Sequence, residues 1–367
     1  MARVVGVLLF GVVLAALACA CGEMPTYQGQ GGVFDSPVGI AIHWPYAYVT
    51  NANFDLSDDK KGKINVVDLR LALTRRDKAV IHSTKTDPYL AKIVLSLDGR
   101  TAYVAGRRNN NILYFDLTDP ERPEPIDLDP DEDGTQGVGV SKQPFGLALS
   151  PDGRDLYVAC ISQGNITIVD LETNKIAQTV QLTSGVSEVK FDPTGTYAYV
   201  TNRIQQTVTL LEAGSGAIAG TFEPGPPTTL TGYDNRGLDF TPDGRYLFIA
   251  ARSPGALLMI DTDKLPLYPQ RALLRTLPTD LGPTGVAVTP DGREAWVCNF
   301  DGDTVAAFHA ETGELLRVMR GIAGPYDIKI FEDGDHPGHY YALTANFQGH
   351  NLTLLDVLTK EVIWAIP

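Results

Sequence analysis

Short apolar segments recur along this chain at a nearly regular spacing. Seven of them are variants of a strand that ends in Tyr-Val-Thr-Asn, and they lie at 47–51, 102–106, 156–160, 198–202, 247–251, 295–299 and 340–346. A second apolar segment follows each of these and ends at one polar position, which is occupied by Asp68, Asp116, Asp170, Glu212, Asp261, His309 and Asp356. The pattern repeats roughly every 40 to 55 residues, which is the length of a four-stranded propeller blade.

Turn residues divide each repeat into shorter strands. Three repeats begin with a short apolar strand and a Pro-Asp-Gly turn, at 151–153, 242–244 and 290–292, and Asp-Gly supplies the backbone geometry of a tight hairpin. No segment with helical periodicity interrupts the repeats. A lone sheet cannot bury both of its faces, whereas radially arranged sheets cover one another. We therefore expect an all-β fold, a seven-bladed β-propeller of four-stranded antiparallel blades over residues 33–367.

These repeats resemble the YVTN family of β-propeller repeat proteins, and the resemblance covers nearly all of residues 33–367. It implies the propeller fold and a bacterial or archaeal surface or envelope protein. Related propellers include lactonases, and the haem-binding propellers of nitrite reductases are similar in outline. The repeated residues are structural, so the resemblance implies a fold rather than an activity.

The N-terminal segment predicts export. A start with one positive charge is followed by an apolar run at 4–18 and by Cys19 and Cys21, which is typical of a secretory signal. Either cysteine fits the pattern of a bacterial lipobox, in which the thiol is lipidated. An ordinary cleaved signal or an uncleaved anchor is the alternative.

The residues around these cysteines also favour the outer membrane over the inner membrane. Neither Ala20 nor Gly22 is the Asp that resembles an inner-membrane retention signal. We therefore expect a signal segment at 1–21, a flexible tether at 22–32, and a protein of the bacterial cell envelope that is lipid-anchored in the outer membrane.

Charge and cysteine content exclude several classes of protein. The formal net charge of −14 disfavours nucleic-acid binding and adhesion to anionic lipid headgroups, so the lipid is the expected membrane tether. No Cys-x-x-Cys motif is present, which argues against a zinc ribbon and covalently attached haem. Cys160 and Cys298 fall on equivalent strands of the third and sixth repeats, too far apart for a disulfide. We expect a monomer.

The first strand of each blade should line the central channel, and there the repeat usually has Gly or Ala. Six charged residues break that rule: Lys92, Glu188, Lys190, Asp239, Asp327 and Lys329. Isolated buried charges are costly, so these side chains must pair or face water. They form either a network of ion pairs, in which Glu188, Lys190 and Asp239 lie on adjacent blades, or a polar funnel that orients a small ligand.

Loops on one face of the propeller should surround the channel mouth. These loops carry arginines that can hold a carboxylate or a phosphate in two parallel hydrogen bonds: Arg107, Arg108, Arg203, Arg236 and Arg252. Solvated surface arginines are the alternative. The same loops repeat Asn followed by an aromatic residue, as at Phe300 and Phe347. We expect the asparagines to form turns, while exposed Phe side chains would suit a partner surface.

An acidic segment resembles the first half of a calcium-binding loop. Asp129, Asp131 and Asp133 precede Gly134, but Val140 stands where such a loop has a bidentate Glu. The segment is either a solvated insertion between the second and third blades or a weak calcium site. We expect no other cofactor.

These observations favour a non-catalytic envelope propeller that presents its channel face to an envelope protein or a small ligand. The alternative is a lactonase-like hydrolase that uses Glu188, Asp239 and Asp327. Converging carboxylates would favour the enzyme, whereas compensation by the channel lysines would favour the scaffold. The common hydrolase and nucleotide-binding motifs are missing from the sequence.

Overall fold

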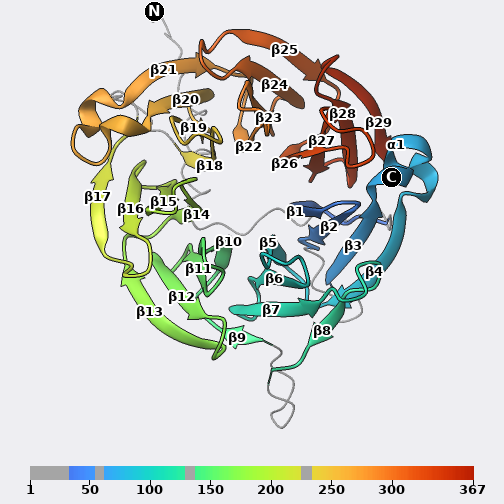
Figure 1. Cartoon of the computed structure of the whole chain (residues 1–367), viewed down its shortest axis with the longest axis horizontal. Helices are drawn as coiled ribbons and strands as arrows, with labels where there is room; N and C mark the ends of the chain where they lie inside the picture. Colours follow the sequence, from blue (N-terminus) through green and yellow to red (C-terminus); the bar gives the residue numbers. More distant parts are fainter. Residues whose placement is uncertain (1–32, 54–61, 129–136, 225–233) are drawn as a thin grey trace, which may run out of the picture.

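The computed structural model describes residues 33–53, 62–128, 137–224 and 234–367, which form a seven-bladed β-propeller (Figure 1). Each blade is an antiparallel sheet whose strands follow chain order from the central axis outward. The strands of blades 1 to 3 are β1 (Pro37–His43), β2 (Tyr46–Asn51), β3 (Gly62–Asp68), β4 (Val80–Thr86); β5 (Leu90–Leu95), β6 (Thr101–Gly106), β7 (Asn111–Asp116), β8 (Glu124–Ile126), β9 (Val138–Gly139); and β10 (Pro144–Leu149), β11 (Asp155–Cys160), β12 (Asn165–Asp170), β13 (Lys175–Gln181). Those of blades 4 to 7 are β14 (Val186–Phe191), β15 (Tyr197–Asn202), β16 (Val208–Glu212), β17 (Ile218–Phe222); β18 (Asn235–Phe240), β19 (Tyr246–Ala251), β20 (Ala256–Asp261), β21 (Leu273–Pro278); β22 (Pro283–Val288), β23 (Glu294–Asn299), β24 (Thr304–His309), β25 (Leu315–Arg320); and β26 (Pro325–Glu332), β27 (Tyr340–Asn346), β28 (Asn351–Asp356), β29 (Glu361–Ile366).

The second strand of each blade is almost completely buried, because neighbouring blades cover both faces of the sheet. In β11, for example, every residue after Asp155 is buried. The outermost strands behave differently, and β13 is exposed at all positions except Val180. The repeated apolar segments of the sequence are thus the strands that have no solvent-facing side.

Two kinds of turn connect the strands as the sequence predicts. The glycines of the Pro-Asp-Gly turns, Gly153, Gly244 and Gly292, have φ of 74°, 73° and 73°. The polar residue that ends each third strand caps the turn that follows it. Asp170 accepts hydrogen bonds from the backbone N–H groups of Glu172 and Thr173 at 3.0 and 2.7 Å.

His309 occupies the same position as these carboxylates in blade 6. Its Nδ1 accepts hydrogen bonds from the N–H groups of Glu311 and Thr312 at 3.2 and 3.3 Å. The ring nitrogen therefore replaces the carboxylate oxygen in the turn.

The fourth strand of blade 2 is divided into two pieces. β8 pairs with one half of β7, from Tyr114 to Asp116, and β9 pairs with the other half, at Asn111 and Ile112. The expected insertion between blades 2 and 3 therefore interrupts the outer strand of blade 2. Its acidic residues Asp129, Asp131 and Asp133 lie outside the described residues, as do the segments 1–21 and 22–32 with Cys19 and Cys21.

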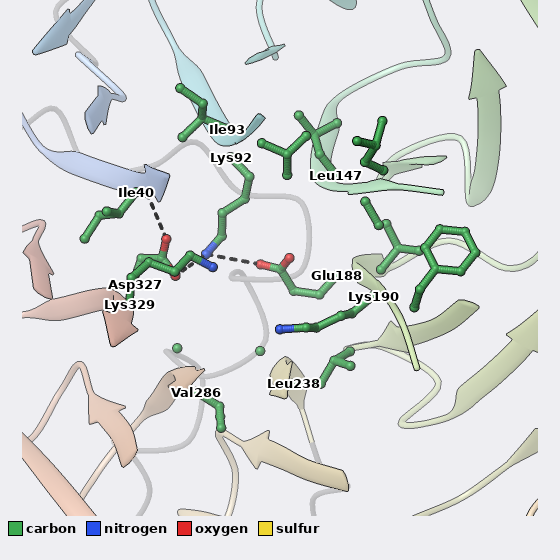
Figure 2. Close-up of a pocket in the computed structure, with 17 residues that line it drawn as sticks. Ile40, Lys92, Ile93, Leu147, Glu188, Lys190, Leu238, Val286, Asp327 and Lys329 are labelled. Carbon is green, nitrogen blue, oxygen red and sulfur yellow. Dashed lines mark hydrogen bonds and ion pairs between the residues drawn. The ribbon is translucent and has the colours of Figure 1, made fainter. Parts of the chain in front are cut away.

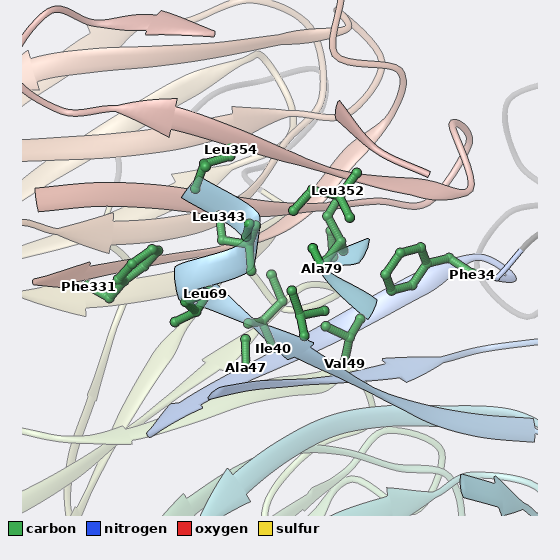
Figure 3. Packing of buried hydrophobic residues seen from close by; sticks show 14 residues of the cluster. Phe34, Ile40, Ala47, Val49, Leu69, Ala79, Phe331, Leu343, Leu352 and Leu354 are labelled. Atoms are coloured by element: carbon green, nitrogen blue, oxygen red, sulfur yellow. The ribbon is translucent and has the colours of Figure 1, made fainter. Parts of the chain in front are cut away.

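The ring closes between blades 1 and 7 by side-chain packing. Within the described residues each blade is built from consecutive strands, so the first and last blades share no strand. One buried cluster spans the closure and includes Phe34, Leu69, Leu343, Leu354 and Ile366 (Figure 3).

A short helix between β3 and β4 strengthens this closure. The described residues contain one α-helix, α1 (Leu69–Thr74). They also contain three 3₁₀ turns, at Arg76–Lys78, Thr262–Lys264 and Pro269–Arg271. The indole N–H of Trp364 in blade 7 donates to the carbonyl oxygen of Ala72 at 2.8 Å. No helix in the described residues has the length and apolar character needed to cross a membrane.

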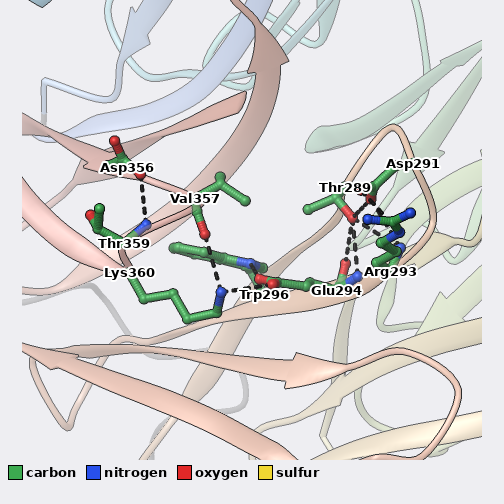
Figure 4. Close-up of polar contacts among 9 residues, drawn as sticks. All are labelled: Thr289, Asp291, Arg293, Glu294, Trp296, Asp356, Val357, Thr359 and Lys360. Carbon is green, nitrogen blue, oxygen red and sulfur yellow. Dashed lines mark hydrogen bonds and ion pairs between the residues drawn. The ribbon is translucent and has the colours of Figure 1, made fainter. Parts of the chain in front are cut away.

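Polar contacts join blades 6 and 7 at the turn between β28 and β29 (Figure 4). Lys360 Nζ lies 2.7 Å from Glu294 Oε1, and both side chains are less than one fifth exposed. Glu294 Oε2 also accepts the indole N–H of Trp296 at 3.0 Å. Cys160 and Cys298 are free and buried, as expected.

Candidate functional site

The innermost strands of all seven blades line a central cavity of about 300 Å³ (Figure 2). At two positions of these strands the sequence has Gly or Ala in about half of the cases, Val94 in one, and the six charged residues predicted to line the channel in the others. All but Asp239 are among the residues that line the cavity.

Lys92 stands at the centre of the larger group of charges. Its Nζ lies 2.7 Å from Asp327 Oδ1 and 3.4 Å from Glu188 Oε1. Asp327 Oδ2 in turn accepts the backbone N–H of Ile40 at 3.0 Å. These contacts connect blades 2, 4, 7 and 1 across the channel.

A second ion pair joins Lys190 of blade 4 to Asp239 of blade 5. Asp239 Oδ2 also accepts the backbone N–H of Val288 in blade 6 at 2.9 Å. The expected network of Glu188, Lys190 and Asp239 is therefore wrong in one respect. Glu188 pairs with Lys92, because the lysine side chain is long enough to cross the channel from blade 2.

Burial and neighbouring charges perturb these groups in opposite directions. Burial acts to raise the pKa of Asp327, but Lys92, Lys329 and hydrogen bonding outweigh it and the pKa is lowered. Burial raises the pKa of Glu188, and the attraction of Lys92 offsets this only in part.

Lys329 differs from the other channel lysines. It makes no hydrogen bond or ion pair within the described residues, and burial lowers its pKa although Asp327 acts to raise it. The six formal charges of the channel still sum to zero.

Aromatic rings cover one end of this channel. The ring of Tyr326 lies 6.4 Å from Phe145 of blade 3 and 5.8 Å from Phe300 of blade 6, measured between centroids. Phe347 lies 5.9 Å from both Tyr326 and Phe300. Lys92 Nζ lies 5.9 Å from the centre of the Tyr326 ring, so Tyr326 links these rings to the channel charges.

Three of the predicted arginines gather beside these rings. The guanidinium of Arg107 lies over Tyr89 at 4.5 Å and over Phe145 at 5.5 Å. Arg236 pairs with Asp234 at 2.7 Å. Burial lowers the pKa of Arg203, and the charges of Arg236 and Arg107 add to that effect, so both of these guanidiniums lie within electrostatic range of Arg203.

The other two arginines are not part of this group. Arg252 pairs with Asp301 at 2.8 Å and lies over Phe300 at 5.3 Å. Arg108 is exposed. The asparagines at the ends of the second strands make structural contacts, but turn formation holds only in part. Asn202 accepts the N–H groups of Ile204 and Gln205 at 2.9 and 2.8 Å, whereas Asn299 and Asn346 donate to residues of the neighbouring third strand.

Sequence reasoning missed Phe145, Tyr326 and Tyr89. The strand pairing shows that Phe145, Arg236 and Tyr326 share one position, the second residue of the innermost strand. Comparing that position across the repeats would have revealed two aromatic residues and an arginine where other blades have Val, Ala, Ser or Thr.

The described residues hold no group of three or more His, Cys, Asp or Glu side chains placed to bind a metal ion. The calcium-loop carboxylates are outside those residues, so the expected weak calcium site stays a prediction.

Comparisons with known proteins show the fold more clearly than a family. No protein-family model matches the chain. Hydrazine synthase subunit beta from Kuenenia stuttgartiensis is 25% identical over an alignment of 204 residues that covers 44% of this chain and 52% of the subunit. Protein groucho from Drosophila melanogaster is 26% identical over 136 residues, covering 37% of this chain and 17% of groucho. The chain thus spans about half of the first relative and less of the second.

Solved structures match over much more of the chain. A chain of Kuenenia stuttgartiensis hydrazine synthase superposes with a TM-score of 0.70 at 16% identity, covering 92% of this chain and 99% of that one. A functionally unknown protein from Desulfotomaculum acetoxidans has a TM-score of 0.63 at 14% identity, with 83% and 92% coverage. A protein from Lactobacillus plantarum has a TM-score of 0.65 at 14% identity, covering 82% of this chain and 89% of that one. At these identities the similarity shows the propeller fold alone.

Proposed function

We propose that this protein is a non-catalytic YVTN-type propeller of the bacterial cell envelope, anchored in the outer membrane by a lipid on Cys19 or Cys21. It binds a small ligand or an envelope protein on the face that carries Tyr326 and the arginines. The contrast between the two layers of the site carries this proposal. Carboxylates in the channel are compensated by lysines, whereas the mouth above them carries aromatic rings and arginines, of which Arg203 makes no ion pair within the described residues.

The paired carboxylates give no support to a lactonase-like hydrolase. Glu188 and Asp327 share Lys92, and Asp239 is held by Lys190 and by a backbone N–H. A general base or metal ligand needs lone pairs that are accessible to substrate or ion. The hydrazine synthase relative is by name a subunit, which supports assembly with another protein as one role for such a propeller.

Capture from solubilised envelope tests the binding face. The purified propeller carrying Phe300→Ala should retain less protein partner or metabolite, identified by mass spectrometry, than the wild type. Leu358→Ser is the matched control, since Leu358 is 77% exposed and lies in the turn between β28 and β29. Equal capture by all three proteins would place binding elsewhere.

Labelling cells with a palmitate analogue tests the anchor. We expect label on the mature N-terminus and sedimentation with the outer membrane. An unmodified N-terminus on a protein that remains in the supernatant would contradict the lipid anchor.

A further inference from the structure

At the mouth of the channel three arginines are accompanied by one paired carboxylate, although the protein is acidic. The charges of Arg107 and Arg236 both act on Arg203, and Arg236 forms an ion pair with Asp234. The chain as a whole has a formal net charge of −14. Like charges that gather against the sign of the whole molecule are unfavourable until an anion neutralises them.

Arg107 is held in place by ring contacts. Its guanidinium lies 4.5 Å from the centre of Tyr89 and 5.5 Å from that of Phe145, so cation–π contacts with two rings hold the group. Its Nε is buried and, among the described residues, has no hydrogen-bond partner. A guanidinium fixed by its faces keeps the N–H groups along its edge for a planar anion.

Arg203 supplies the second cation. Arg203 is the first residue after β15, and the last residue of that strand, Asn202, is held by its own hydrogen bonds. Within the described residues Arg203 makes no hydrogen bond or ion pair, although it is mostly shielded from solvent. Burial lowers its pKa, and so does the nearby charge of Arg236. Asp234 and Tyr326 act in the opposite direction, but Asp234 forms its ion pair with Arg236. A partly buried cation that lacks a direct ion pair is the arrangement that an oxyanion would stabilise.

The surroundings limit the size of the ligand. Tyr326 contacts Phe145, Phe300 and Phe347, and its ring lies 5.9 Å from Lys92 Nζ of the channel. The net negative charge of the whole protein repels an extended polyanion at long range, whereas a small anion interacts mainly with the local positive group.

We propose that Arg107, Arg203 and Arg236 form a receptor for a small ligand that bears a carboxylate or phosphate group, with the rings around Tyr326 as the adjoining apolar wall. This inference rests on the proposed binding function and names the chemistry of its ligand. Carboxylate and phosphate share the planar pair of oxygen acceptors that an arginine fork recognises.

Thermal melts and calorimetry with two probes test the receptor. Inorganic phosphate and succinate are added separately at millimolar concentrations, with sodium chloride at matched ionic strength as the salt control. We expect one or both to raise the melting temperature of the wild type beyond the effect of chloride, and the probe that does so identifies the anion class. Arg203→Gln and Arg107→Gln should each weaken that binding at least about tenfold, since each removes charged hydrogen bonds.

The control variant is Arg154→Ala, because Arg154 is 81% exposed and lies in the turn before β11. It should bind the probe as the wild type does. Without a probe, Arg203→Gln should melt at the wild-type temperature or above it, because the change relieves repulsion with Arg236. Arg203→Lys should keep the charge but recover only part of the affinity, since ammonium lacks the fork.

Several outcomes would overturn the receptor. They are no response of the wild type to either probe, unchanged binding by the two Gln variants, or an unliganded Arg203→Gln protein that is strongly destabilised while still responding to the probe. Loss of the anion response together with continued Phe300-dependent capture from envelope would reject this inference and leave the proposed function standing.

Discussion

At the scale of single residues, the channel shows how a repeat accommodates charge at positions meant for Gly or Ala. Lys92 reaches two carboxylates from other blades, and its side chain is only 14% exposed. Removing one partner of a buried ion pair is far more costly than replacing the whole set, because the remaining charge stays buried without compensation. Lys92 and Lys329 line the same cavity, but only Lys92 forms ion pairs among the described residues.

We predict that Lys92→Met lowers the free energy of unfolding by about 3–5 kcal/mol, because Glu188 and Asp327 then lose the lysine that pairs with both of them. Adding Glu188→Gln and Asp327→Asn to that variant should restore much of the loss. Lys329→Met is the control and should cost little, since its amine has no direct partner in the described residues. Urea unfolding measures all three; equal losses for Lys92→Met and Lys329→Met would contradict the assigned pairs.

The two carboxylates beside Lys92 should affect the pH dependence of stability in separate windows. The pKa of Asp327 is lowered from its usual 3.8, so its stabilisation is complete above pH 3.8 and is lost as pH falls through the folded-state value. The pKa of Glu188 is raised from its usual 4.5, so its stabilisation is complete below pH 4.5 and is lost as pH rises through the folded-state value.

Unfolding measured from acid to neutral pH checks both signs. Asp327→Asn should flatten the profile below pH 3.8, and Glu188→Gln should remove a decline above pH 4.5. Profiles of both variants that run parallel to the wild type throughout would show that neither group is perturbed.

At the scale of elements, the sequence predicts best the strands that are buried on both faces. The seven second strands and the polar ends of the third strands were placed correctly, since neighbouring blades force the same apolar pattern in every repeat. The fourth strands are less buried than the second strands, and β13 is the most exposed of them, so their composition carries little signal. The division of one of them into β8 and β9 was therefore not predicted. The helix α1, which lies between β3 and β4, was not predicted either.

The Pro-Asp-Gly turns allow a test of backbone geometry alone. Gly244 has φ of 73°, and a methyl group added there would lie 3.5 Å from the nearest atom of Pro193, an ordinary contact. We predict that Gly244→Ala costs about 1–2 kcal/mol, the strain of a left-handed conformation for an L-residue. The control is Gly139→Ala, which meets no atom within 4 Å and should be nearly neutral. Chemical denaturation of both variants gives the comparison; a neutral Gly244→Ala would show that the turn relaxes without strain.

At the scale of the whole molecule, the candidate site could be predicted in part. Aligned repeats reveal the unusual charges of the innermost strands and the arginines of the loops, because both depart from the pattern of their neighbours. Their pairing depends on distances across the ring, which no repeat contains, and so Lys92 was not recognised as the partner of Glu188. The second residue of the innermost strand was not compared, and Phe145 and Tyr326 were missed with it.

The closure of the ring makes one interface unlike the other six. Blades 1 and 7 are held together by the cluster around Leu69 and Leu343 and by the bond from Trp364 to Ala72, with no peptide connection between them. Phe34 and Ile366 lie in that same cluster, so the two ends of the propeller are neighbours. We therefore expect the packing of the blades to be independent of which boundary between blades holds the chain break.

A circular permutant should consequently fold to the same ring. Joining residue 366 to residue 34 through a short Gly-Ser linker and opening the chain between Thr183 and Ser184, both exposed, moves the break to the boundary of blades 3 and 4. We expect a cooperative melt and a circular dichroism spectrum like those of the wild type. Opening the chain between Val200 and Thr201, inside the buried strand β15, should abolish folding. In this architecture any of the seven boundaries between blades could then hold the two ends of the chain.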